Sequence, residues 1–266
     1  MPPKLIKIKH GINVLSLFDG MSCGQIALER AGIKVDKYFA SEIDKYAIEV
    51  TQANYPNTIQ LGDITKWREW DDLPEVDLIL AGSPCQDLSI ALKGAGLKGS
   101  KSSLFFVFVE ILNHYKPKNF LLENVVPYKK EFKANIDLSV GVTGISINSD
   151  RFVGQNRPRV YWTNIKIDEL PNRPRWNKQY YRYRSNYFRE NKSGVCPCLT
   201  ANMGMGGHNV PLKSENLKDK LTPVECERLQ TIPVNYTNYV SNSRRYKMIG
   251  DGWTVDVIVY ILKGIR

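Results

Sequence analysis

The sequence predicts a three-layer α/β fold, in which a parallel sheet is covered by helices on both faces. Between residues 12 and 125, short apolar runs alternate with helical patterns, and strands that alternate with helices build such a sheet. With 266 residues, of which 42% are hydrophobic, the chain can bury a substantial core. These observations predict one large α/β domain with room for a smaller appendage.

The predicted elements follow from the apolar pattern. Strands are expected at residues 12–18, 37–40, 58–61, 76–80 and 119–122, with two further strand-like runs at 144–148 and 159–165. Helices are expected after the first turn as far as residue 30, and over residues 44–53, 102–115, 221–229 and 253–265. Thr222 followed by Glu225 predicts a capping box at the start of the helix over 221–229.

The composition and the apolar periodicity of the chain change after residue 165. Residues 166–220 lose the apolar periodicity and gain Pro, Asn, Gly, Arg and Tyr. We therefore predict three parts: an α/β domain over residues 1–165, an inserted irregular module over 166–220, and a C-terminal segment over 221–266 that returns to the α/β domain.

Charge and cysteine content indicate partners and compartment. The net charge of +10 favours a polyanionic partner. Five cysteines, an odd number spread along the chain, argue for reduced thiols in a cytosol, so we expect a cytoplasmic protein. No apolar run approaches a membrane span, and the basic start lacks the pattern of a signal peptide, so we expect no membrane partner.

Three predicted strand ends indicate a nucleotide-type site. The turn Leu17–Gly24 is made mostly of small residues and leads into a helix, whose first N–H groups face a ligand. Glu42 ends the second strand, where an acid binds ribose hydroxyls in such folds, and Asp63 ends the third and could bind an adenine amino group. The alternative is a packed turn with two helix-capping acids.

Cys85 lies just beyond the fourth predicted strand, in Ala81-Gly-Ser-Pro-Cys-Gln-Asp-Leu-Ser89. A small-residue turn after a buried strand presents its side chains at the ligand-binding edge of the sheet, so the thiol is placed to attack a substrate. The alternative is a small core residue.

Four short motifs occur in a fixed order: Phe18-Asp-Gly20, Ser83-Pro-Cys-Gln86, Glu123-Asn-Val125 and Gln155-Asn-Arg-Pro-Arg159. The ordered set resembles the signature of DNA cytosine carbon-5 methyltransferases, from about residue 12 to the C-terminus and most weakly over 166–220. Asp19, with Asp87-Leu-Ser89 and Leu104-Phe-Phe106, resembles short phage and bacterial members and the de novo branch. The resemblance implies a Rossmann-like methyltransferase sheet plus a small irregular target-recognition module.

The resemblance also implies the chemistry, which suits these residue types. Carbon 5 of cytosine is a poor nucleophile until a thiolate, here Cys85, adds at carbon 6. Glu123 would protonate or hydrogen-bond ring nitrogen 3. Arg159 would hold the carbonyl at position 2, with Arg157 as its support or as a phosphate contact.

S-adenosylmethionine is the expected cofactor, leaving as S-adenosylhomocysteine. The run Gly250-Asp-Gly-Trp-Thr-Val255 resembles the family's C-terminal cofactor segment, although Asp251 stands where the family usually has Asn. The expected cofactor contacts are Phe18, Asp19, Gly20, Met21, Ser22, Cys23, Gly24, Glu42, Ile43, Asp63, Ile64, Gly82, Pro84, Leu104, Trp253 and Thr254.

Duplex DNA is the expected partner. Residues 86–103 resemble a loop that closes over a flipped-out base, and residues 172–192 interleave basic and aromatic side chains, as suits phosphate contact. The expected DNA contacts are Gln86, Ser89, Lys101, Gln155, Arg173, Arg175, Arg182 and Arg184. One close cysteine pair, Cys196 and Cys198, with His208 is weak support for zinc, so we expect no metal.

Three other functions remain open at this stage: an RNA methyltransferase of the same lineage, a catalytically silent DNA-binding relative, and an unrelated α/β thiol enzyme. The silent relative should have lost Cys85, Glu123 or the arginines, all of which are present. The sequence leaves the choice between monomer and homodimer open.

Overall fold

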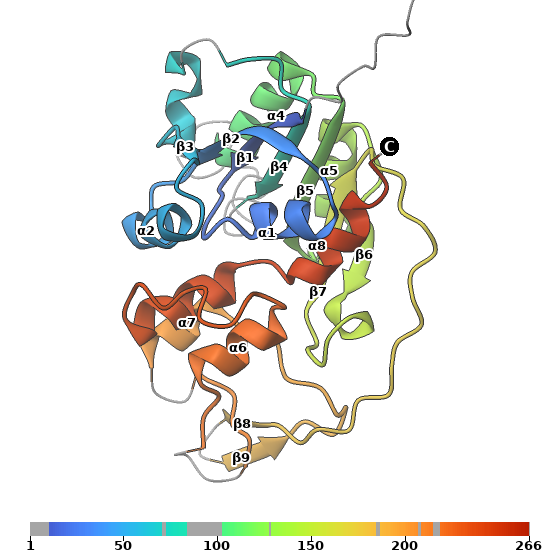
Figure 1. Cartoon of the computed structure of the whole chain (residues 1–266). Coiled ribbons are helices and arrows are strands. Elements are labelled where there is room, and N and C mark those ends of the chain that lie inside the picture. The colour runs from blue at the N-terminus through green and yellow to red at the C-terminus, as the bar shows by residue number, and fades with distance from the viewer. Residues whose placement is uncertain are drawn as a thin grey trace, which may run out of the picture.

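The larger of two lobes is built on a seven-stranded sheet in the order β3-β2-β1-β4-β5-β7-β6, as the computed structural model shows (Figure 1). The structure describes residues 11–70, 73–83, 103–127, 129–184, 187–206, 209–214 and 219–265. The strands are β1 (Ile12–Leu17), β2 (Val35–Ser41), β3 (Ile59–Gln60), β4 (Leu78–Gly82), β5 (Asn119–Val125), β6 (Ile145–Asn148) and β7 (Pro158–Thr163).

Alternating side chains divide the core into two layers, one on each face of the sheet. Along β1, Val14 packs into one layer and Leu15 into the other, as the period of two in a strand requires. The first layer is covered by α1 (Cys23–Arg30), α2 (Lys45–Asn54) and α8 (Val255–Leu262). The second is covered by α4 (Ser103–Tyr115), α5 (Lys130–Val140) and the 3-10 helix η1 (Ile64–Glu69). The predicted three-layer α/β class is confirmed.

Strand β7 forms from the strand-like run over residues 159–165, for which no direction was predicted. It runs antiparallel to both β5 and β6, while the pairs from β3 through β5 are parallel. The reason is the connection from β6, which spans only residues 149–157 and includes the short 3-10 helix η3 (Ser149–Arg151). A parallel return needs a crossover of a dozen or more residues, whereas an antiparallel return does not.

The smaller lobe contains a two-stranded hairpin and two helices. Its elements are β8 (Tyr181–Arg184), β9 (Tyr187–Glu190), the 3-10 helix η4 (Ala201–Met205), α6 (Pro223–Leu229) and α7 (Asn242–Asp251). The predicted capping box is present, because Glu225 N donates to Thr222 Oγ1 and Thr222 N donates to the Glu225 carboxylate.

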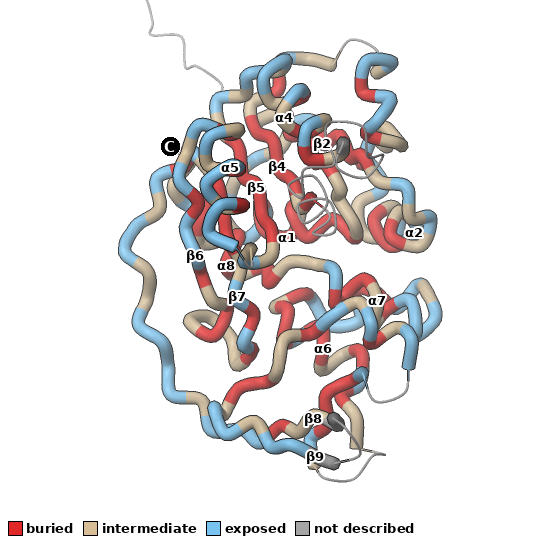
Figure 2. Tube along the Cα trace, turned by 180° about the vertical axis from the view of Figure 1, so that it is seen from behind, coloured by how far each residue is buried: buried red, intermediate tan, exposed pale blue. Residues whose placement is uncertain are grey.

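The chain returns to the sheet later than the predicted boundary at residue 221. Figure 1 shows α6 and α7 in the smaller lobe, and only α8 beside α1 on the sheet. Buried residues lie on both sides of the junction between the lobes (Figure 2). Within the described residues, no helix is both long enough and apolar enough to cross a membrane.

Candidate active site

The carboxyl ends of β4 and β5 and the start of β7 meet at one edge of the sheet. Gly82 at the end of β4 pairs with Glu123 in β5, and Val125 pairs with Arg159 in β7. Because β7 is reversed, its first residues rather than its last lie beside the carboxyl end of β5. This edge is where ligands bind in open α/β sheets.

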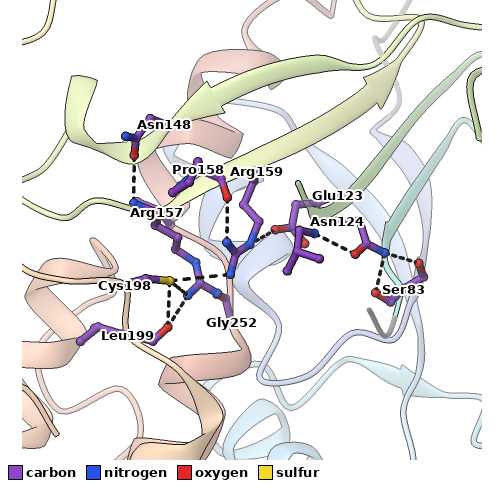
Figure 3. A network of polar contacts seen from close by, with 12 residues as sticks. Ser83, Glu123, Asn124, Asn148, Arg157, Pro158, Arg159, Cys198, Leu199 and Gly252 are labelled. Atoms are coloured by element: carbon purple, nitrogen blue, oxygen red, sulfur yellow. Dashed lines mark hydrogen bonds and ion pairs between the residues drawn. The ribbon is translucent and has the colours of Figure 1, made fainter. Parts of the chain in front are cut away.

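Glu123 and Arg159 form an ion pair at this edge (Figure 3). Arg159 Nε lies 2.9 Å from Glu123 Oε1, and the two side chains are 14% and 11% exposed. Burial alone would lower the pKa of Arg159, but the Glu123 carboxylate raises it, so the guanidinium stays charged. The sequence-predicted catalytic acid and arginine are thus in direct contact and remain reachable.

Arg157 has a different environment, although it is two residues away. Its guanidinium is buried and donates to the carbonyl oxygens of Leu199, Gly250 and Gly252 at 2.6, 3.0 and 2.8 Å. Burial lowers the pKa of Arg157, and the neighbouring charge of Arg159 lowers it further. Arg157 therefore joins β7 to the smaller lobe and to the α7–α8 connection, and it has no free surface for a phosphate.

Asn124 ties the turn that leads to Cys85 to the same edge. Its buried amide donates to Ser83 Oγ at 2.8 Å and to the Ser83 carbonyl at 3.0 Å. The predicted site residues Pro84, Cys85, Gln86, Ser89 and Lys101 lie outside the described residues. No role was predicted for Asn124, although it stands in the motif Glu123-Asn-Val125. Its place next to Glu123 was the feature of the sequence that could have indicated a role at the site.

The turn after β1 has an unusual backbone. Phe18, Gly20 and Ser22 all have φ between +57° and +59°, a region that non-glycine residues rarely adopt. Asp19, inside this turn, accepts hydrogen bonds from Ser16, Ser22 and Tyr38. Burial raises the pKa of the Asp19 carboxyl to about 6, despite these three hydroxyl donors. Backbone strain of this kind clusters at ligand sites.

Glu42 joins this turn to the end of β2. Its carboxylate accepts from the backbone N–H groups of Gly20, Ile43 and Asp44 at 2.7 to 2.8 Å. A carboxylate has about four acceptor positions, so one remains for a hydroxyl. Next to it, Ile43 exposes 74% of its surface. An exposed apolar side chain beside an oriented carboxylate suits a nucleoside.

The other predicted cofactor residues are divided between the surface and the interior. Asp63 caps η1, since its Oδ1 accepts from the amide and the hydroxyl of Thr65. Leu104 is half-buried against the second core layer. The side chains of Met21, Cys23, Ile64 and Thr254 are buried in the protein, so they can reach a cofactor only through their backbone. Burial raises the pKa of the Cys23 thiol to about 12.

Two of the predicted glycines are sites of close packing. A Cβ on Gly82 would lie 2.9 Å from the Trp253 indole nitrogen, and one on Gly24 would lie 2.7 Å from the Tyr38 hydroxyl. Trp253 is half-buried, so its indole lies against the end of β4 and keeps an accessible surface. The C-terminal segment thus reaches the same sheet edge as the β1 turn.

Gln155 is a correction to the predicted DNA contacts. Its side chain is fully buried, donates to the Leu229 carbonyl and to Gln230 Oε1, and accepts from Leu199 N. All of its polar atoms are satisfied inside the protein, so it cannot contact DNA in this structure. It joins the residues before β7 to the smaller lobe instead, through its bonds to Leu199, Leu229 and Gln230.

The predicted arginines of the module have three different environments. Arg173 pairs with Asp150 at 2.6 Å, Arg175 is exposed, and Arg182 donates to the Cys198 carbonyl at 2.9 Å. The side chain of Arg184 lies outside the described residues. Arg189, absent from the predicted contacts, pairs directly across the hairpin from Arg182, and both line a cavity of about 740 Å³.

No group of three metal-binding side chains occurs in the portion of the chain that the structure describes. Cys196 lies in the core, where burial raises the pKa of its thiol, and His208 lies outside the described residues. Cys198 lies instead beside Arg157 and Arg159.

Comparisons with known proteins agree with this arrangement. A family model for C-5 cytosine-specific DNA methylases matches residues 12–139 and 148–266. The Type II methyltransferase M.Bsp6I of Bacillus sp. strain RFL6 is 30% identical over 311 residues, covering 96% of this chain and 98% of that protein. The orphan methyltransferase M.SPRI of Bacillus phage SPR is 35% identical over 184 residues, covering 64% of this chain and 41% of that protein.

Solved structures share the fold. EhMeth of Entamoeba histolytica superposes with a TM-score of 0.69 at 16% identity, covering 97% of this chain and all of that one (100%). Dnmt2 of S. pombe gives a TM-score of 0.65 at 17% identity, covering 94% and 97%. The family match spans both lobes and includes the residues around the Glu123–Arg159 pair. The chain belongs to the C-5 cytosine-specific DNA methylases.

Proposed function

We propose that this DNA methyltransferase transfers a methyl group from S-adenosylmethionine to carbon 5 of a cytosine flipped out of duplex DNA, through a covalent adduct between Cys85 and carbon 6. The observation that carries the proposal is the Glu123–Arg159 ion pair, which stands beside the turn leading to Cys85. A duplex base must leave the stack before a thiol can reach it.

Each side chain has a separate task in this reaction. The Cys85 thiolate adds to carbon 6, and the electron pair displaced from the ring is stabilised at nitrogen 3 by a proton shared with Glu123. Arg159 keeps Glu123 in place and offers its charged guanidinium to the ring carbonyl. After the methyl group has reached carbon 5, water removes the proton from that carbon, and the electron pair expels the thiolate from carbon 6.

The residues around the β1 turn fit a nucleoside cofactor. Glu42 would hold the ribose hydroxyls, and Ile43 would pack on the adenine ring. The free Oδ2 side of Asp63 and the indole of Trp253 would flank the same ring. S-adenosylmethionine supplies the electrophilic methyl group when bound. The buried Arg157 supports the site by holding the α7–α8 connection.

Duplex DNA would lie along the smaller lobe. Arg182 and Arg189 stand directly opposite one another in the hairpin, an arrangement of like charges that costs stability unless an anion is bound between them. Phosphate groups of DNA are the natural anions there. We place the enzyme in the cytoplasm, where its DNA substrate and reduced thiols coexist.

The decisive experiment transfers a labelled methyl group to duplex DNA and, separately, to RNA. Wild type should label DNA, and Cys85→Ser should label neither polymer. Wild type should also form a covalent complex on DNA that contains 5-fluorocytosine, because carbon 5 then carries fluorine in place of the proton whose removal expels the thiolate. Cys85→Ser should form no such complex. Label in RNA with none in DNA would contradict the proposal.

A further inference from the structure

Cys198 is placed differently from the other cysteines. Of the four that the structure describes, Cys23, Cys196 and Cys226 are buried and only Cys198 is partly exposed. Its Sγ lies 3.5 Å from Arg157 Nη1 and 4.0 Å from Arg159 Nη2, so it faces both guanidinium groups (Figure 3). The four short motifs that carry the family resemblance do not include this position, which belongs to the smaller lobe.

The orientation of the Arg159 fork depends on three partners. Its Nε is bound by Glu123 and its Nη1 by the carbonyl of Pro158 at 2.8 Å. Among the described residues, the third nitrogen, Nη2, has Cys198 as its partner. A guanidinium is rigid and planar. A contact at Nη2 therefore limits how far the whole group can turn while Nε stays bound to Glu123.

The backbone around Cys198 is fixed from both sides. Arg182 of β8 donates to its carbonyl at 2.9 Å. The next residue, Leu199, donates to Gln155 at 3.1 Å and accepts from Arg157 at 2.6 Å. The backbone of Cys198 therefore stays beside the arginines unless these hydrogen bonds break, two of which are buried and costly to leave unmade.

We infer that Cys198 is a positioning residue for Arg159: the smaller lobe supplies, through this thiol, the contact that holds the catalytic guanidinium in line with Glu123. The inference rests on the proposed role of Arg159. Cys198 acts only through the arginine and does not touch the base. Because Arg182 of β8 donates to the Cys198 carbonyl, the orientation of Arg159 depends on the hairpin β8–β9 as well as on the sheet.

The test measures kcat at saturating DNA and S-adenosylmethionine. Cys198→Ala removes the acceptor with little change in volume and should lower kcat about tenfold, the loss expected for one hydrogen bond to a charged group. The KM for S-adenosylmethionine should stay within about twofold, since the side-chain contacts of Cys198 are with Arg157, Arg159 and the Leu199 carbonyl rather than with Glu42. Cys198→Ser restores an acceptor and should recover kcat to within about threefold of wild type.

Cys196→Ala is the matched control, because this buried cysteine lies two residues away and does not face the arginines. It should lower thermal stability and leave kcat unchanged. Wild-type kcat in Cys198→Ala, or a Cys198→Ser variant as slow as Cys198→Ala, would overturn the inference.

A double variant separates this inference from the proposed function. If Cys198 acts through Arg159, adding Cys198→Ala to Arg159→Lys should lower kcat no further, whereas independent effects would multiply and overturn the inference. If Arg159→Lys itself kept wild-type kcat, the proposed role of Arg159 would fail, and this inference with it. An impaired Arg159→Lys beside a fully active Cys198→Ala overturns the inference alone.

Discussion

Arg157 and Arg159 are two positions apart in the chain, but their side chains have different surroundings and partners. Arg157 is buried among backbone carbonyls, whereas Arg159 pairs with a carboxylate at an accessible edge. Removing Arg157 would leave buried carbonyl oxygens without donors, which affects folding. Removing Arg159 would leave Glu123 without its partner, which affects the reaction. The same residue type is thus buried in a backbone contact at one position and stands, in the proposed reaction, beside the base at the other.

Substitution of Glu123 tests the acid directly. Glu123→Gln keeps the shape of the side chain but can no longer share a proton with the ring. We expect kcat to fall by roughly a hundred-fold to ten-thousand-fold, the usual contribution of a positioned acid or base. Binding of DNA should change little, which a gel-shift or fluorescence titration measures. A variant with near wild-type kcat would exclude Glu123 as the acid.

Asp19 links pH to stability. Its pKa is raised from 3.8 to about 6 in the folded protein, so the folded state holds its proton over a range where the unfolded chain has lost it. Stability from this group is therefore present below about pH 4 and is lost as pH rises through about 6, by on the order of 3 kcal/mol. Asp19→Asn lacks this dependence.

The measurement is denaturant unfolding of wild type and Asp19→Asn at several pH values. The stability of the variant relative to wild type should increase between about pH 4 and pH 7. The comparison cancels Asp44, Asp137 and Glu225, whose pKa values are lowered and whose contributions run in the opposite direction. A constant difference across this range would show that Asp19 ionises normally.

At the scale of elements, two buried glutamines join the lobes. Gln155 before β7 and Gln230 after α6 bond to each other, and Gln230 also donates to Ile249 and Gly252. Thr254 at the start of α8 donates to Gln230 Oε1 as well. Three segments that are far apart in the chain therefore share one hydrogen-bonded centre.

Gln155→Ala should destabilise the protein by about 2–4 kcal/mol. The substitution removes the hydrogen bonds that the Gln155 side chain makes to Leu199 N, the Leu229 carbonyl and Gln230 Oε1. Denaturant unfolding checks this value. Gln179→Ala is the control: among the described residues, the side chain of this exposed glutamine bonds to Glu190 at 3.3 Å alone. Its loss should cost less than about 0.5 kcal/mol. Equal effects in both variants would argue against the buried centre.

Most elements of the sheet follow from the sequence, because each strand is a compact apolar run. No direction was predicted for β7, since periodicity carries no information on strand direction. Helix α5 was also missed, although Phe132, Ile136 and Val140 recur every four residues and are buried. In the smaller lobe, the strands β8 and β9 are largely polar and aromatic, so no apolar alternation marks them.

The candidate site was predictable to the extent that its residues stand in short ordered motifs. Glu123 and Arg159 stand in such motifs and lie at this sheet edge, whereas Glu42 was expected there because it ends the second strand. Gln155 stands in the same motif as Arg159, but its burial depends on a lobe that folds from residues more than seventy positions away. Cys198 needed the same tertiary information. The roles of Cys85 and the loop after it stay predictions.

At the scale of the whole molecule, the charge of +10 predicts salt-dependent binding of DNA. Arg189→Ala removes one charge from the hairpin cavity, and the slope of log affinity against log salt should become shallower by about one. Arg68→Ala is the control, because Arg68 pairs with Glu110 on the face that α4 covers. Titrations at several salt concentrations measure both; an unchanged slope for Arg189→Ala would place the DNA elsewhere.

The ends of the hairpin β8–β9 meet where Asn191 N donates to the Tyr180 carbonyl at 2.7 Å, and Tyr181 exchanges two backbone hydrogen bonds with Leu212 at 2.9 Å. Its two ends are therefore held together independently of what lies between them. A replacement of residues 181–190 by a hairpin of another length or sequence should leave Glu123 and Arg159 in place, provided that Cys198 keeps a donor for its carbonyl. If this hairpin contacts DNA as proposed, its replacement should change the DNA sequence that is bound and leave the reaction unchanged.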